Sequence, residues 1–473
     1  MPLHDSLEPI RMSRVAIVAA TSQLRRVLVE VADAGVVQVE TGDEVAPPGS
    51  VEESNLLRSR YDTTVPGAKT HPVATLALEA PELSSLTRPD ESGMLLGEVE
   101  LERVMTASRG DGGVTALAGW CPTPAIRALA ARLAPLGGAV VELPFPPGSE
   151  PPTLVEASGA TRAFQPLVDT YSILPYADLD PASVAGLAYV VMFGMMFGDV
   201  GHGALLVIAG ILLARRRPRA FARFHSFAPF VMGAGIASCI FGLAFGEMFG
   251  PTHVVPTLWI APLNHATTLL AVAVAAGAGL LTIAYVLGTV NRFREGGAGR
   301  ALLAVSGFAG TLLYLGLAVV GLGWYRHARG ALIIGAALAL LGLGLAFAGL
   351  FKASEGRFGG VLQAGIETFD SLIRIGTNTM SFARLAAFGL THAALCGLIW
   401  SATTALEHRG LPGVIAGVAV FLVGNTVAFA LEGLVAGIQA LRLEYYELFS
   451  RILVNEGHQF RPWHVPILST RES

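Results

Sequence analysis

The chain has 473 residues, of which 52% are hydrophobic and only 14% are charged, and its mean hydropathy is +0.57. This composition is too apolar for an ordinary soluble protein and predicts a membrane protein. The net charge of −4 is small and the sequence has no basic stripe, so no nucleic-acid partner is expected. The three cysteines, Cys121, Cys239 and Cys396, are far apart and form no zinc or disulfide pattern, so neither a metal site nor a cofactor is expected.

Residues 1–180 contain no apolar run that could cross a membrane, and we expect them to form a small cytoplasmic α/β domain. Two stretches have a β-α-β pattern: VAIVA, a helix over 22–34 and VVQVE; then ALAGWC, a helix in TPAIRALAARLAPLG and AVVELPF. They predict two small lobes with an irregular segment around 43–72 between them. Neither lobe carries a dinucleotide-binding or phosphate-loop glycine pattern, so they are expected to pack or to dock another protein, without a catalytic site.

Residues 181–473 are expected to form a helical membrane domain. The apolar runs predict eight spans: 184–198, 201–214, 227–249, 265–290, 301–324, 330–351, 369–406 and 411–450. The first two are short and flank the polar sequence GDVGHG, which favours a tight helical hairpin. Lysine and arginine are concentrated in alternate loops, and the chain starts without the apolar stretch of a signal peptide. Both observations predict that the two termini are cytoplasmic.

The last two predicted spans are unusually long and carry polar residues. Each has about 40 residues, roughly 60 Å as a helix, which is about twice the length of an upright crossing. We therefore expect them to tilt or to project from the membrane. In the last span, Asn425, Glu432 and Gln439 recur every seven residues, with Arg442 one turn beyond. Such a stripe must face protein or water rather than lipid.

Arg384 is the most informative residue of the chain. It lies 11 residues into the seventh predicted span, roughly 16 Å of helical rise, close to the middle of a hydrocarbon core about 30 Å thick. Because a guanidinium does not readily deprotonate, this is a permanent cation, and such residues usually mark an ion path. The alternative is a structural ion pair with an acid on another helix. His392, two turns later, is either a second residue of the path or an interior histidine.

These sequences resemble the membrane subunit of rotary V/A-type ATPases, called subunit a or subunit I. The resemblance rests on PYADLDP, FGMMFGDVGHG, SFARLAAFGLTHAAL and LEGLVAGIQALRLEYYELFSRILVNEGHQF, together with RMSRVAIVAA and ALAGWCP. The soluble part differs from the family pattern, because relatives usually have two lobes joined by a long coiled coil. Residues 43–115 show no sustained heptad pattern, so the coiled coil is expected to be largely missing.

The resemblance implies a stator that faces a ring of proteolipids, binds peripheral stalk and other rotary ATPase subunits, and translocates protons across the cell membrane. It implies that Arg384 is the family's indispensable arginine and that the residues matching its ion path are His392, Arg442, Glu432, Gln439 and Asp370. Asn425 extends that path as a member of the polar stripe. Asp199 and His202 in GDVGHG, and Glu247 in FGEMFG, match family markers that we expect to be structural.

Two other functions remain open on the sequence alone. A secondary transporter or channel acting by itself would favour internally repeated membrane halves, which the sequence does not show. A non-pumping membrane scaffold derived from the same family is the other alternative, because the soluble part is short.

Overall fold

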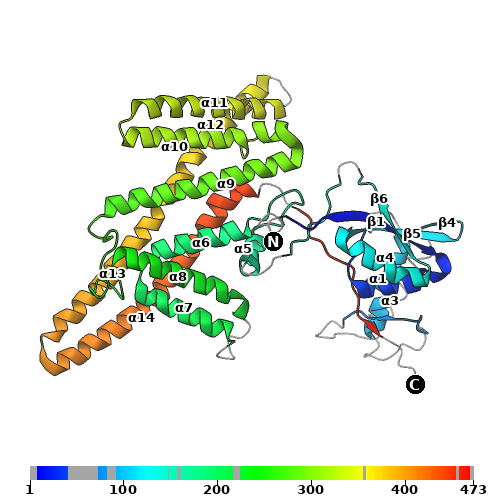
Figure 1. Ribbon diagram of the computed structural model, residues 1–473, viewed down its shortest axis with the longest axis horizontal. Helices are drawn as coiled ribbons and strands as arrows, with labels where there is room; N and C mark the ends of the chain where they lie inside the picture. The colour runs from blue at the N-terminus through cyan, green and yellow to red at the C-terminus, as the bar shows by residue number, and fades with distance from the viewer. Residues whose placement is uncertain are drawn as a thin grey trace. The chain divides into compact units, whose positions relative to one another are not determined.

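The computed structural model describes residues 8–40, 73–82, 92–146, 149–156, 161–216, 224–354, 358–453 and 457–468. The segment around 43–72, for which the sequence predicts irregular structure, lies outside these residues. The chain divides into two compact units (Figure 1). The first, the sheet unit, draws on residues 9–156 and 457–473, and the second, the helical unit, on residues 1–8 and 157–456. The sheet unit therefore takes in both early and late parts of the sequence.

The sheet unit contains a five-stranded sheet with the order β2-β5-β1-β6 and with β4 paired to β5. The strands are β1 (Met12–Ala20), β2 (Gln38–Val39), β4 (Arg109–Asp111), β5 (Val114–Pro122) and β6 (Ala139–Leu143). Both predicted β-α-β units are present, but they do not form separate lobes. A strand of each unit lies between the two strands of the other, and β1 pairs antiparallel with β5 and β6. Together they form a single sheet.

The core of the sheet unit lies between the sheet and its helices α1 (Leu24–Ala34), α3 (Ser92–Thr106) and α4 (Ile126–Leu133). The late segment of the chain completes this core. Trp463 and Val465 are buried in the same cluster as Val27 and Leu28 of α1. The strand β7 (Ile467–Leu468) pairs in parallel with β3 (Leu76–Ala77).

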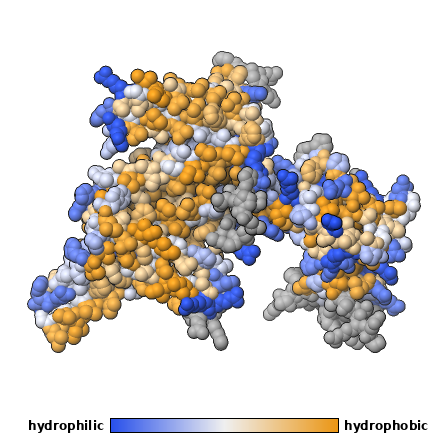
Figure 2. Space-filling model, viewed as in Figure 1, coloured by the Kyte–Doolittle hydropathy of each residue, from blue (hydrophilic) through white to orange (hydrophobic). Residues whose placement is uncertain are grey.

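The helical unit is made of α5 to α15. Their bounds are α5 (Thr161–Tyr171), α6 (Ala182–Met196), α7 (Val200–Ala214), α8 (Ala228–Phe245), α9 (Ala266–Leu303), α10 (Phe308–Tyr325), α11 (Arg329–Ala353), α12 (Phe358–Ser381), α13 (Ala383–Glu407), α14 (Gly410–Leu443) and α15 (Ser450–Ile452). A π-helical segment, η6 (Glu444–Phe449), joins the last two. Large apolar side chains are exposed over many of these helices, and Figure 2 shows apolar residues covering most of the visible face. This is the surface of a multi-pass membrane protein.

The described residues contain six helices that are long and apolar enough to cross a membrane. The predicted count of eight is not confirmed, because α6 and α7 have only 15 residues each. The predicted hairpin between them is wrong. α8 packs along both helices, beside Gly194 of α6 and Gly203 of α7, while α6 and α7 make little contact within the described part of the chain. The intervening α8 prevents them from packing on each other.

The seventh predicted span lies within one candidate membrane span, Gly359–Glu407. The helix is locally irregular at Phe382, which separates α12 from α13, and Arg384 is the second residue of α13. The Phe382 side chain is fully buried, and it lies directly over Gly277 of α9, where an added Cβ would be 2.1 Å from the Phe382 Cγ atom. This packing fixes the place where α13 begins. α13 and α14 then lie side by side.

The PYADLDP sequence connects the start of the membrane helices to their late end. The backbone N–H of Leu179 donates to Asn291 Oδ1 of α9 at 3.1 Å, and Asn291 Nδ2 donates to the Ile452 carbonyl at 3.4 Å. Beside them, Arg292 forms a buried ion pair with Glu295 at 2.5 Å, and its Nη2 atom is 3.9 Å from Asp178 Oδ2. A stretch quoted for the family resemblance therefore ties three segments of the helical unit together.

Candidate functional site

Two residues of the predicted ion path meet between α13 and α14. His392 Nδ1 and Glu432 Oε2 are 2.5 Å apart, which joins the two helices by a hydrogen bond. The His392 side chain is 2% exposed and that of Glu432 is 12% exposed. A short hydrogen bond to a carboxylate orients the imidazole and directs its other nitrogen, Nε2, away from Glu432. His392 is therefore neither isolated nor free to rotate.

The turn between α6 and α7 lies against this pair. Asp199 caps the N-terminus of α7: its Oδ1 atom accepts the backbone N–H of His202 at 2.9 Å. Its Oδ2 atom accepts the N–H of Gly250 at 3.0 Å. Gly250 has φ +94°, and a Cβ there would lie 2.8 Å from the Cys396 carbonyl, so only glycine fits. The loop after α8 is thus held between the α6–α7 turn and α13.

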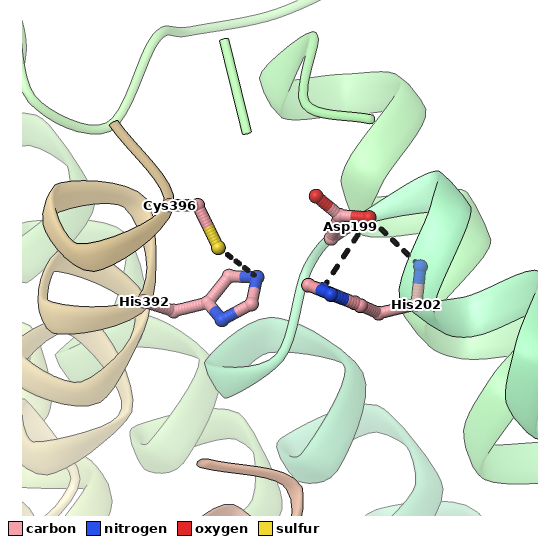
Figure 3. Close-up of side chains that lie close together, drawn as sticks. All are labelled: Asp199, His202, His392 and Cys396. Carbon is pink, nitrogen blue, oxygen red and sulfur yellow. Dashed lines mark hydrogen bonds and ion pairs between the residues drawn. The ribbon is translucent and has the colours of Figure 1, made fainter. Parts of the chain in front are cut away.

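Asp199 and His202 were expected to be structural, and Asp199 does cap a helix, but both also face α13. Their side chains converge with those of His392 and Cys396, as Figure 3 shows. The His202 and His392 rings are 5.5 Å apart between centroids. Phe197 packs against both rings, which closes that side of the group. Residues far apart in sequence therefore share one buried site.

Glu247, the third family marker, lies in the loop after α8 and is 5% exposed. Its carbonyl accepts the Val200 N–H at 3.0 Å, at the start of α7. Burial raises the pKa of Glu247 from 4.5 to about 7; His392 opposes that shift, whereas Asp199 adds to it. A carboxyl group that titrates near neutral pH therefore lies within electrostatic range of the His392–Glu432 pair.

Arg384 lies apart from this group, at the start of α13, and its side chain is partly exposed. The charged groups that act on it most strongly are Arg442 of α14 and Glu447 of η6. No carboxylate of a described residue lies within ion-pair distance of Arg384, and the same holds for the exposed Arg442. The two arginines form a cationic surface at the late end of α14, and Arg384 is not locked to an internal counter-ion.

The other predicted path residues occupy different surroundings. Asn425 is buried and donates to the Phe421 carbonyl at 2.9 Å, while Gln439 has a buried Oε1 atom without a hydrogen-bond partner. Asp370 is exposed on α12, where it pairs with Arg374 at 2.6 Å. The structure therefore brings Glu432 and His392 together, but it does not place Asp370 in contact with either of them.

Three residues at these sites were missed in the sequence. Cys396 follows His392 by four residues, one helical turn, which places both on the same face and would have been a usable signal. Glu444 is fully buried and neither of its carboxyl oxygens has a partner, and Glu447 lies within electrostatic range of Arg384. Both lie on the π-helical segment, a local distortion often found at functional sites, which an apolar pattern does not reveal.

Comparison with known proteins agrees with these features. Residues 108–269 match the model of the V-type ATPase 116kDa subunit family. A-type ATP synthase subunit I of Halobacterium salinarum is 27% identical over 67% of this chain and 52% of its own length. The same subunit of Thermococcus kodakarensis is 26% identical over 74% and 54%, and that of Methanocaldococcus jannaschii is 26% identical over 69% and 51%.

The chain thus spans about half the length of the relatives it matches. The matched stretch covers the sheet strand β5, the PYADLDP loop and the α6–α7 turn with Asp199 and His202. Together with the apolar helices, these similarities support a subunit of a rotary ATPase. They support placing the chain in the V/A-type ATPase subunit a/I family.

Proposed function

We propose that this chain is the membrane stator of a rotary ATPase and that Arg384 discharges the carboxylates of a passing proteolipid ring. The observation that supports this most directly is the state of Arg384. It is partly exposed at the α12–α13 junction, with no carboxylate of a described residue in ion-pair distance. A cation without an ion-pair partner among the described residues is available to an acid on another chain.

The chemistry follows from the charge of the guanidinium. A rotor carboxyl group that faces lipid is neutral, because desolvation disfavours its anion. At about 4 Å from Arg384, with an effective dielectric constant of about 20, the anion gains up to ~4 kcal/mol. That corresponds to about three pKa units and is enough to release the proton. Arginine stays charged throughout, so it also prevents protons from passing directly between the two sides of the membrane.

The released proton then needs a polar route. We propose that the His392–Glu432 pair, which joins α13 to α14, supplies this route on one side of Arg384 together with Gln439 and Asn425 of α14. Asp370 is exposed on α12 and belongs to the opposite route, toward the cytoplasm. We further propose that the sheet unit docks the peripheral stalk, since it has a polar exterior and no catalytic pattern.

The test is ATP-driven acidification of membrane vesicles that carry the complete ATPase. Arg384→Ala should abolish acidification while the subunits still copurify, because the substitution removes the charge and not the fold. Arg384→Lys should retain only a small part of the activity, since a buried ammonium can lose its proton.

Arg326→Ala is the matched control. Arg326 is an exposed arginine at the end of α10 and is not among the residues proposed for the ion path, so its removal should leave acidification close to that of the unchanged protein. Normal acidification by the Arg384→Ala protein would refute the proposal. So would an intact chain that copurifies with no other ATPase subunit, which would favour a transporter acting alone.

A further inference from the structure

We propose that Asp199, His202, His392 and Cys396 form a binding site for one divalent transition-metal ion, with Zn²⁺ the best match. Each side chain offers one ligand atom, and these atoms all lie within 4.8 Å of one another. The site shares His392 with the proposed ion path, but it is tested by metal binding itself and not by ion translocation. The sequence shows no metal-binding pattern because the ligands come from two separate helices.

The spacing of the ligand atoms is close to that of a tetrahedral centre. Zinc bonds of about 2.0–2.3 Å place neighbouring ligand atoms roughly 3.3–3.6 Å apart in a tetrahedron. In the structure, Cys396 Sγ is 3.9 Å from His392 Nε2, and His202 Nδ1 is 3.7 Å from Asp199 Oδ1. Closing the group around an ion therefore requires movements of about 1 Å or less at the ends of side chains.

His202 provides an independent indication of a ligand. Its side chain is fully buried, yet neither ring nitrogen has a hydrogen-bond partner. An unpaired buried polar group costs free energy, so such groups are rare and require an explanation. A metal ion bound to one of the ring nitrogens would satisfy that nitrogen.

Glu432 prepares His392 for the same role. Metal-bound histidines commonly donate their second ring N–H to a carboxylate, which fixes the tautomer and makes the other nitrogen a better ligand. Here Glu432 Oε2 lies 2.5 Å from Nδ1 of His392, and Nε2 points to Cys396. The Glu432 carboxylate thus orients the His392 imidazole so that its other nitrogen faces the Cys396 thiol, the second ligand.

The ligand set determines the kind of ion. Two imidazoles, one thiolate and one carboxylate suit Zn²⁺, whereas Ca²⁺ and Mg²⁺ prefer oxygen ligands throughout. The thiolate and the Asp199 carboxylate together match the charge of a divalent ion, and the Glu432 carboxylate beside His392 adds a further negative charge that attracts the cation. Binding releases the Cys396 thiol proton to solvent and forms a metal–sulfur bond, without oxidation or reduction.

The experiment is a metal-binding measurement on the full chain purified in detergent and freed of metal by chelation. After exposure to Zn²⁺ and dialysis, about one zinc per chain should remain. X-ray absorption at the zinc edge should show one sulfur at about 2.3 Å and nitrogen or oxygen ligands at about 2.0 Å. Co²⁺ in place of Zn²⁺ should give a thiolate-to-cobalt charge-transfer band. These measurements need no variant, so a folding defect cannot obscure them.

Variants then assign the ligands. Cys396→Ser should remove the sulfur signal and most of the bound zinc, and Glu432→Gln should weaken binding about tenfold to a hundredfold. Cys239→Ser is the matched control: Cys239 belongs to the same unit but donates to the Val200 carbonyl and is not one of the four ligands, so zinc content should not change. Two results would overturn the site. One is a wild-type zinc content no higher than that of Cys396→Ser, and the other is a metal shell without sulfur.

Discussion

Asp178 lies in the loop before α6 and is fully buried beside Arg292 and Glu295. Burial raises the pKa of Asp178 from 3.8 to about 7, and the neighbouring Glu295 adds to the effect, while Arg292 opposes it. The folded protein therefore favours the neutral acid. This loop is hydrogen-bonded to Asn291 of α9, which in turn is hydrogen-bonded to Ile452 of α15. The protonation state of Asp178 therefore affects the stability of the helical unit.

We predict that Asp178→Asn stabilises the protein increasingly as the pH rises. An acid whose pKa is raised by folding contributes fully below its unfolded pKa, and this contribution is lost as the pH rises through the folded value. The window here runs from about pH 4 to about pH 7. Thermal unfolding of both proteins in detergent should give a midpoint difference that grows across this window and then levels off. A difference that is constant or shrinks with pH would contradict the assignment.

The sequence could predict which side chains lie close together only where they share one face of the same helix. The heptad spacing of Asn425, Glu432 and Gln439 indicated one face of the last helix, and the structure places Asn425 in the interior and Glu432 against His392. The approach of Asp199 and His202 to His392 could not be predicted in the same way. It depends on how α8 and the loop at Gly250 hold the α6–α7 turn, and one chain's hydrophobic pattern does not encode such packing.

At the scale of helices, the position of Arg384 depends on the packing of Phe382 against α9. The sequence around Phe382, TMSFARLAA, contains neither proline nor glycine, so the apolar pattern predicts a continuous helix. The helix is only locally irregular there, at the residue whose ring is buried at Gly277, where an α-carbon without a side chain leaves room for it. Such a tertiary contact overrides local propensity.

We predict that Gly277→Ala displaces this junction. The added methyl group would collide with the Phe382 ring, and overpacking of this kind typically costs about 1–3 kcal/mol. The midpoint of thermal unfolding should fall, and ATP-driven acidification should fall with it, because Arg384 is two residues from the displaced ring. Gly279→Ala, on the same helix, meets nothing within 4 Å and serves as the control. Equal behaviour of the two variants would show that the contact does not position Arg384.

At the scale of the whole molecule, the late segment of the chain is part of the sheet unit. The backbone N–H of Trp463 donates to the Val37 carbonyl at 2.8 Å, and the backbone N–H of Leu76 donates to the Pro466 carbonyl at 2.7 Å. Trp463 and Val465 also complete the apolar core. The segment therefore contributes both backbone hydrogen bonds and buried area to a unit whose strands lie hundreds of residues earlier.

We predict that ending the chain at residue 456 destabilises the sheet unit strongly. Loss of a buried tryptophan alone costs about 3–5 kcal/mol, which is a large share of the stability of a small domain. Limited proteolysis of the purified chain should cut the region 9–156 much faster in the truncated protein. A chain that ends after Leu468 keeps every described contact of this segment, and its digestion should match that of the full chain. Slow digestion of the 456-residue protein would contradict the prediction.

The sequence predicted the positions of the strands better than it predicted which strands pair with each other. Alternating and apolar runs located β1, β2, β5 and β6, but periodicity does not say which strands pair, so two lobes were expected where one interlocked sheet forms. The segment HQFRPWHVPIL reads as a loop because its prolines interrupt any repeat. Its role in the core depends on contacts that span more than 400 residues, such as that of Trp463 with Val37.

The inclusion of residues 457–473 in the sheet unit has a consequence for biosynthesis. The ribosome makes the strands first, then every bilayer-spanning segment, and only then the tryptophan that fills the core. Domains generally fold as units while the chain emerges from its N-terminal end. Here the first-made portion has to wait, incompletely packed, until Trp463 has been synthesised, so its maturation reports that all the helices between have already been made.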